Sequence, residues 1–185
     1  MLDNLLLAFW FLLPAGLANM APVFAAHLPV LKHLEAPMDG GRKFRGKPVL
    51  GPNKTWRGLI SGMVIATLIL YLQQLAAANY QWAQAFTVEV DYSLLPTLIL
   101  GPLFGLGALG GDAIESFFKR QAGRRSGDSW LPYDQIDYVL GGILVSLPFV
   151  QLEIMLYLLM ILLYCGLHIA VSYVGWLVGL KAKPI

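Results

Sequence analysis

GGDAIESFFKRQAGRRSGDSWLPYDQIDYVLGG, residues 110–142, is the stretch of the sequence that decides the fold. It holds five of the chain's 11 acidic residues: Asp112, Glu115, Asp128, Asp134 and Asp137. Four basic residues lie between them: Lys119, Arg120, Arg124 and Arg125. The segments on both sides are apolar enough for lipid, where a charged side chain costs on the order of 2.5–3.5 kcal/mol. A charged cluster between apolar segments therefore indicates a functional site at a membrane surface.

The composition predicts an integral membrane protein with one domain over residues 1–185. The chain is 57% hydrophobic and 13% charged, whereas a soluble domain is about 45–50% apolar and about 25% charged. The first thirty residues have no basic segment, so we do not expect a cleavable signal. The single cysteine, Cys165, lies in an apolar segment, which excludes disulfides and cysteine-type zinc sites. We expect no nucleic-acid partner.

The apolar segments predict an all-α polytopic membrane protein with about five transmembrane helices. A span needs roughly 20 residues, so the third and fourth spans must include part of the charged stretch. This places Asp112, Asp134 and Asp137 at helix ends near the lipid boundary. The expected spans are residues 5–31, 58–75, 93–112, 134–150 and 154–180.

The distribution of cations predicts the orientation. With five spans, all 13 Lys and Arg residues fall on one side. That side carries two long loops, residues 32–57 and 113–133, and the tail after residue 180. By the positive-inside rule this side is cytoplasmic and the N-terminus is outside. We therefore expect a multi-pass protein of the cell membrane with a cytoplasmic C-terminus and a site on the cytoplasmic face.

The acidic residues have the spacing of a metal site. On a helix opened by GGD, positions i, i+3, i+4 and i+7 share one face; these are Asp112, Glu115, Ser116 and Lys119. Asp134 and Asp137 share a face of the next span, and Mg²⁺ typically takes one or two carboxylates plus substrate phosphates. We therefore predict one or two Mg²⁺ ions at Asp112, Asp134 and Asp137. The alternative is that Asp112 and Asp134 are helix N-caps.

The loop GGRKFRGKPVLGPNKTWRG, residues 40–58, predicts an anion site. Glycines and prolines alternate with its six cations, and irregular loops of this kind expose backbone N–H groups to phosphates. It is not a Walker A loop, because Pro52 and Asn53 come before the Lys54-Thr55 pair. A patch for anionic lipids, or a simple topological signal, is the alternative. The cations are Arg42, Lys43, Arg45, Lys47, Lys54 and Arg57.

These features together indicate an enzyme that transfers a nucleotidyl or phosphoryl group to a lipid. They are carboxylates that could bind a metal, a cationic loop that could bind phosphates, and a position at the membrane surface. No general base is obvious, because His27, His33 and His168 lie outside the acidic cluster. An alcohol acceptor would need activation. A phosphate monoester already carries about −1.5 to −2 charges at pH 7 and could attack unaided.

Several motifs resemble the signature of the CTP-dependent phosphatidate cytidylyltransferases. They are Ser116-Phe117-Phe118-Lys119-Arg120, Gln121-Ala122-Gly123, Leu131-Pro132 and Asp134-Gln135-Ile136-Asp137. The basic loop, with Leu13-Pro14-Ala15 and Ala18-Asn19, is more similar to the archaeal branch, the CDP-archaeol synthases. Two departures from the diacylglycerol-type signature fit that branch. Where the signature has Lys-Asp after its Ala-Gly pair, this sequence has Arg125-Ser126, and the next acidic residue is Asp128. Where the signature has Gly-His-Gly-Gly between its Pro and Asp, this sequence has only Tyr133.

The resemblance implies that CMP passes from CTP to a lipid phosphate, giving a CDP-lipid and pyrophosphate with the help of Mg²⁺. The acceptor would be an unsaturated archaetidic acid or a phosphatidic acid. The implied catalytic residues are Asp112, Asp134, Asp137, Lys119 and Arg120. The implied nucleotide-binding residues are Arg42, Lys43, Arg45, Lys47, Asn53, Lys54, Thr55, Arg57, Glu115, Ser116 and Arg124. Of these cations, Lys119, Arg120 and Arg124 are expected to steer the lipid phosphate.

Two other functions remain open at this point. A CTP-dependent lipid kinase, such as a polyprenol kinase, would release CDP instead of pyrophosphate. A non-enzymatic lipid-binding protein would use the basic loop alone. The glycines at 101, 105 and 107 could pack a second copy of the chain or another span, so a homo-oligomer is possible.

Overall fold

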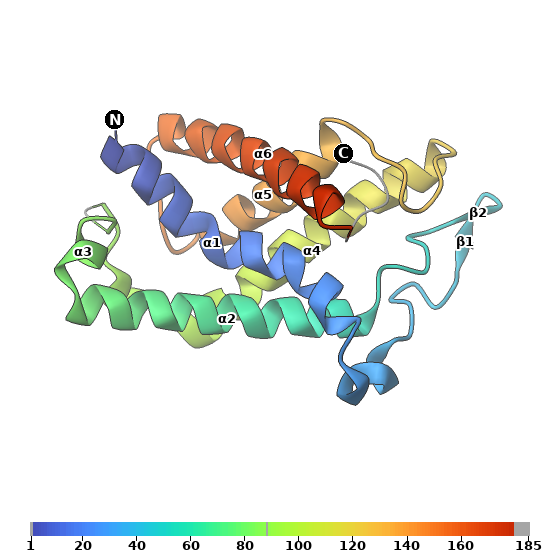
Figure 1. Cartoon of the computed structure of the whole chain (residues 1–185), viewed down its shortest axis with the longest axis horizontal. Helices are drawn as coiled ribbons and strands as arrows, with labels where there is room; N and C mark the ends of the chain where they lie inside the picture. Colours follow the sequence, from blue (N-terminus) through green and yellow to red (C-terminus); the bar gives the residue numbers. More distant parts are fainter. Residues whose placement is uncertain (1, 88, 180–185) are drawn as a thin grey trace.

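A bundle of α-helices makes up most of the computed structural model, which describes residues 2–87 and 89–179 (Figure 1). The longer helices are α1 (Leu2–Ala25), α2 (Trp56–Asn79), α4 (Thr97–Gln121), α5 (Tyr133–Ser146) and α6 (Ile154–Leu177). The shorter elements are α3 (Gln81–Gln84), two 3₁₀ turns (Pro29–Leu34 and Tyr92–Leu94) and the strands β1 (Lys43–Phe44) and β2 (Lys47–Pro48).

Among the described residues, four helices are long and apolar enough to cross a membrane: α1, α2, α4 and α6. The prediction of a helical multi-pass protein is therefore confirmed. The remaining predicted span, the fourth (134–150), corresponds to α5, which has only 14 residues. Helix α4 continues past the expected end of its span at 112, so the predicted loop 113–133 is helical up to Gln121. The predicted cytoplasmic tail lies outside the described residues.

The two ends of the bundle differ in charge. The start of α1 and α3 lie at one end, and the β1–β2 hairpin and the α4–α5 connection lie at the other (Figure 1). The Lys and Arg residues of the described chain fall between 32 and 57 or between 119 and 125. All of them therefore gather at the hairpin end.

Glycines let α4 lie against its neighbours at backbone distance. A Cβ added to Gly105 would come within 2.5 Å of Met63 Cα on α2. A Cβ added to Gly141 of α5 would come within 1.9 Å of Gly107 O on α4. Small residues allow this close approach of membrane helices. The glycine run therefore packs against other spans of the same chain, and the possible homo-oligomer stays a prediction.

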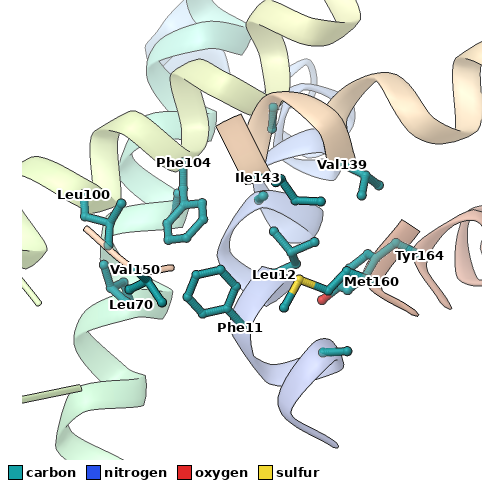
Figure 2. Close-up of a cluster of buried hydrophobic side chains, with 14 of the residues drawn as sticks. Phe11, Leu12, Leu70, Leu100, Phe104, Val139, Ile143, Val150, Met160 and Tyr164 are labelled. Carbon is teal, nitrogen blue, oxygen red and sulfur yellow. The ribbon is translucent and has the colours of Figure 1, made fainter. Parts of the chain in front are cut away.

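Apolar side chains from all five long helices fill the centre of the bundle (Figure 2). Phe11 of α1 meets Phe104 of α4 edge to face, with the ring centroids 5.8 Å apart. Two tyrosine hydroxyls fix α6: Tyr164 Oη donates to Phe9 O at 2.6 Å, and Tyr138 Oη donates to Tyr164 O at 3.1 Å. The core thus holds α4 and α5 in one orientation below the charged end.

The basic loop is irregular, as predicted, apart from the short antiparallel hairpin β1–β2. Asp39 organises its base, because its carboxylate accepts the backbone N–H groups of Leu50, Gly41 and Gly51 at 2.8, 2.9 and 3.2 Å. Partial burial acts to raise the pKa of this carboxyl, but these hydrogen bonds outweigh it and hold the pKa below its ordinary value. The loop then returns to α2, whose first turn Thr55 caps by accepting Gly58 N at 3.2 Å.

Candidate active site

Three carboxylates meet where α4 crosses α5. Oxygens of Asp112, Glu115 and Asp137 lie within 4.8 Å of one another. The crossing is close because Gly111 has no side chain: a Cβ there would lie 2.2 Å from Asp137 O. The structure therefore brings the predicted pair Asp112 and Asp137 together and adds Glu115, which we had expected to bind the nucleotide.

Two lysines neutralise this acidic group. Lys54 Nζ, from the loop before α2, lies 2.6 Å from Asp112 Oδ2. Lys119 Nζ lies 2.6 Å from Asp134 Oδ1 and 3.6 Å from Glu115 Oε1. The Lys119 side chain is only 7% exposed, and a buried charge is tolerated only when it is paired. The lysines thus make it possible for four carboxylates to share one small volume.

Asp134 lies beside this group, in the first turn of α5. Its Oδ1 accepts Lys119, and its Oδ2 accepts Trp130 N at 2.6 Å. Its predicted role as a metal ligand stays a prediction. The alternative N-cap interpretation is wrong for both residues: Asp112 lies in the interior of α4, and the N-cap of α5 is Pro132 and not Asp134.

The donor set fits a hard divalent cation. All the grouped ligands are carboxylates, the type of donor that Mg²⁺ prefers. In the described part of the chain, Glu115 Oε1 is buried and accepts no hydrogen bond, although it lies 3.6 Å from Lys119 Nζ, and a buried carboxylate oxygen without a hydrogen bond is costly. The i, i+3 spacing of Asp112 and Glu115 was the signal that could have placed Glu115 among the ligands.

The basic loop is tied to the end of α4 and to the α4–α5 connection. Lys47 Nζ donates to Gln121 O at 2.5 Å, and Gln121 Nε2 donates to Pro48 O at 3.3 Å. Asn53 Nδ2 donates to Ser126 Oγ at 3.0 Å. No local pattern indicated Gln121 and Ser126 as partners of the loop, since they lie more than seventy positions along the chain from it.

The remaining predicted residues separate into those with partners inside the protein and exposed ones. Arg57 pairs with Glu35 at 3.4 Å, Thr55 caps α2, and Ser116 is buried in α4. Two arginines hold the α4–α5 connection through backbone carbonyls: Arg120 Nη1 to Arg124 O at 2.7 Å, and Arg124 Nη1 to Ser129 O at 3.0 Å. The exposed ones lie on the hairpin: Arg42, Lys43 and Arg45.

An apolar groove opens beside the carboxylates, between α4 and α5. It has a volume of about 620 Å³. Its walls are mostly apolar and include Ile114, Phe118, Leu140 and Leu144. Glu115, Asp137 and Gly111 also line it. One wall of the groove is therefore shared with the acidic group, so an amphiphile lying in it would present its head to charged residues.

Fold and site together define a polytopic membrane protein whose charged site opens into an apolar groove at one end of the bundle. The family model described as CarS-like, CDP-archaeol synthase, matches residues 1–185. The chain belongs to this family. Its members are transferases of lipid biosynthesis that move CMP from CTP to a lipid phosphate, so the resemblance seen in the motifs is confirmed.

Individual relatives agree over the full length. The CDP-archaeol synthase of Thermococcus onnurineus is 33% identical over 184 residues, covering 99% of this chain and 98% of that one. The protein of the same name from Methanosphaerula palustris is 34% identical, covering 94% and 99%. A solved structure described as an intramembrane enzyme for archaeal membrane lipids biosynthesis is 28% identical, with a TM-score of 0.67 over 89% of this chain and 92% of that chain.

Proposed function

We propose that this protein transfers CMP from CTP to an ether-linked, unsaturated archaetidic-acid-type lipid phosphate. The observation that carries the proposal is the wall shared by the apolar groove and the acidic group, at Glu115 and Asp137. A lipid phosphate in the groove would have its tails against apolar side chains and its head at the site. The choice of an ether lipid rests on the relatives, which are CDP-archaeol synthases.

Asp112, Glu115 and Asp137 would hold Mg²⁺, with Asp134 as a further predicted ligand. Bound Mg²⁺ supplies charge stabilisation to the attacking and leaving phosphate oxygens. Asp134 has a second task in this proposal: it fixes the Lys119 ammonium between α4 and α5. Lys119 then presents its charge beside the groove-lining Glu115, where a lipid phosphate has to be neutralised.

The reaction needs no protein base. An oxygen of the lipid phosphate monoester forms a bond to the α-phosphorus of CTP, and the bond from that phosphorus to the β-phosphate oxygen breaks. Pyrophosphate leaves with the bonding electrons. Lys54 Nζ lies 2.6 Å from Asp112 Oδ2, where it would contact a triphosphate bound at the carboxylates. Fixed cations of this kind reduce the repulsion between two anions and stabilise the charge that develops.

We also propose that α5 crosses the membrane in addition to α1, α2, α4 and α6, which makes five spans. The charged end of the bundle then faces the cytoplasm of the cell. The gathering of the described cations at one end supports this orientation. It can be tested by adding single cysteines at positions 43 and 91 to a Cys165→Ala variant and labelling intact cells. Position 91 alone should react with an impermeant maleimide, and labelling of position 43 would contradict the orientation.

The function is tested with purified protein, Mg²⁺ and CTP labelled on the α-phosphate. An archaetidic-type ether lipid phosphate and a phosphatidic acid are offered in parallel. Radioactive CDP-lipid and pyrophosphate with the ether lipid are expected, and they should disappear in Asp137→Asn. CDP release with transfer of the γ-phosphate would favour the lipid kinase. Faster transfer to phosphatidic acid would contradict the ether-lipid assignment.

A further inference from the structure

The β1–β2 hairpin carries cations that the site does not use. Arg42, Lys43 and Arg45 are exposed, and the Arg45 guanidinium lies 5.2 Å from the centroid of the Phe44 ring. The ion pairs found among residues 2–87 and 89–179 involve Lys54, Arg57 and Lys119 instead. The three hairpin cations are therefore available to an external anion.

The hairpin also has a fixed place beside the groove. Phe44 packs on Phe117 of α4 with the ring centroids 5.8 Å apart, and Phe117 packs on Phe118 at 5.5 Å. Phe118 is 56% exposed and lines the groove. A continuous row of three aromatic rings thus joins the hairpin to the groove, and the hydrogen bonds of Lys47 and Gln121 hold the strand end on α4.

We propose that this hairpin surface, made of Arg42, Lys43, Phe44 and Arg45 with Phe117, is a docking site for anionic lipid headgroups. It collects membrane lipids that carry a phosphate monoester next to the groove through which they reach the carboxylates. Charge complementarity and the aromatic row argue for a lipid, since amphipathic side chains place an apolar body in the membrane interface and a charge in the headgroup layer. The proposal rests on the proposed function and assigns the hairpin cations to the lipid, in contrast to the triphosphate role predicted from the sequence.

The lipid interaction is measured by binding, without turnover. Energy transfer from the protein's tryptophans to a dansyl-labelled glycerolipid phosphate is recorded in mixed micelles of a neutral detergent. Each cation near an anionic surface contributes about a fivefold factor in affinity. The triple variant R42Q/K43Q/R45Q should therefore need at least about tenfold more lipid for half-saturation, and Phe44→Ala should also weaken binding.

The matched control is Lys32→Gln, which removes an exposed cation of the 3₁₀ turn Pro29–Leu34, a turn that does not line the groove. It is compared with the single variant Arg45→Gln, and only the latter should weaken lipid binding. CTP affinity is measured by calorimetry in neutral detergent without lipid. We expect the triple variant to bind CTP within about twofold of the unaltered protein.

Three results separate the possibilities. Equal lipid binding by the triple variant and the unaltered protein would contradict the proposal that the hairpin surface binds lipid headgroups. Loss of CTP affinity with unchanged lipid binding would overturn it too, and would return these cations to the triphosphate. Hairpin-dependent lipid binding without formation of CDP-lipid would sustain the surface and refute the proposed function.

Discussion

Gly111→Ala should move α4 and α5 apart where they cross, and with them the carboxylates of Asp112 and Asp137. Gly111 immediately precedes Asp112 and faces the backbone of α5, where an added Cβ would lie 2.2 Å from Asp137 O and 2.9 Å from Asp137 C. A carbon and a carbonyl oxygen approach to about 3.3 Å. The helices must therefore move apart by about 1 Å at the point where Asp112 and Asp137 meet. Neither contact atom belongs to a side chain that could rotate away.

The expected loss of activity is large compared with the loss of stability. A misplacement of about 1 Å at reacting groups can cost about 100-fold in rate, whereas overpacking costs typically about 1–3 kcal/mol of folding free energy. We expect CDP-lipid formation to fall about 100-fold in a protein that still unfolds cooperatively. Initial rates at saturating CTP and lipid phosphate, together with thermal unfolding in detergent, measure both quantities.

Gly166→Ala provides the control for this substitution. Gly166 also lies inside a long helix, α6, but a Cβ there meets nothing within 4 Å. This variant should keep the activity and the unfolding temperature of the unaltered protein. If Gly111→Ala were as active as Gly166→Ala, the close crossing of α4 and α5 would not be what positions the carboxylates.

Three further predictions concern single side chains. Asp134→Asn should lower CDP-lipid formation by at least about 100-fold, because Lys119 loses the nearer of its two charged partners; full activity would contradict the proposed role of Asp134. The pKa of Asp39 is lower in the folded protein than in the unfolded chain. Its hydrogen bonds should therefore stabilise the basic loop fully at pH values above the unfolded-state pKa of about 3.9. This stabilisation should be lost as the pH falls through the lower pKa of the folded state. The protection of the Leu50 amide, measured as its hydrogen-exchange rate relative to the intrinsic rate at the same pH, should fall in that acidic range. Asp39→Asn should abolish this pH dependence of the protection. Tyr164→Phe removes the hydrogen bond to Phe9 O and should cost about 0.6–1.7 kcal/mol in unfolding free energy, without changing the apparent affinity for CTP.

The hydrophobic pattern predicted the helices because it depends on local composition. Residues 58–75 and 154–180 were expected as spans, and α2 and α6 cover nearly the same positions. The boundaries around the charged stretch were harder. Helix α4 continues to Gln121, and the charges in this part are paired: Lys119 pairs with Glu115 inside α4 and with Asp134 of α5, a condition that hydropathy does not contain.

The sequence predicted which types of residue form the candidate site, but not which of these residues contact one another. Spacing placed Asp112 and Glu115 on one helix face, yet the group with Asp137 depends on a contact between Gly111 and α5 that spans more than twenty positions. Arg42 and Lys54 looked equivalent in the sequence, since both are cations of one loop. The fold separates them, because Lys54 lies against Asp112 while Arg42 stays on the exposed hairpin.

The shortness of α5 has a consequence for the surrounding bilayer. Its 14 residues cover about 21 Å, whereas the hydrocarbon layer is about 30 Å thick. A hydrophobic segment that is too short makes the nearby bilayer thinner or draws headgroups inward. With α5 as a span, as proposed above, the lipids bordering the α5 wall of the groove would lie in locally compressed membrane. A phosphate headgroup moving toward Asp137 would then cross less hydrocarbon there than along the longer helices, so hydrophobic mismatch itself would lower the barrier to substrate entry.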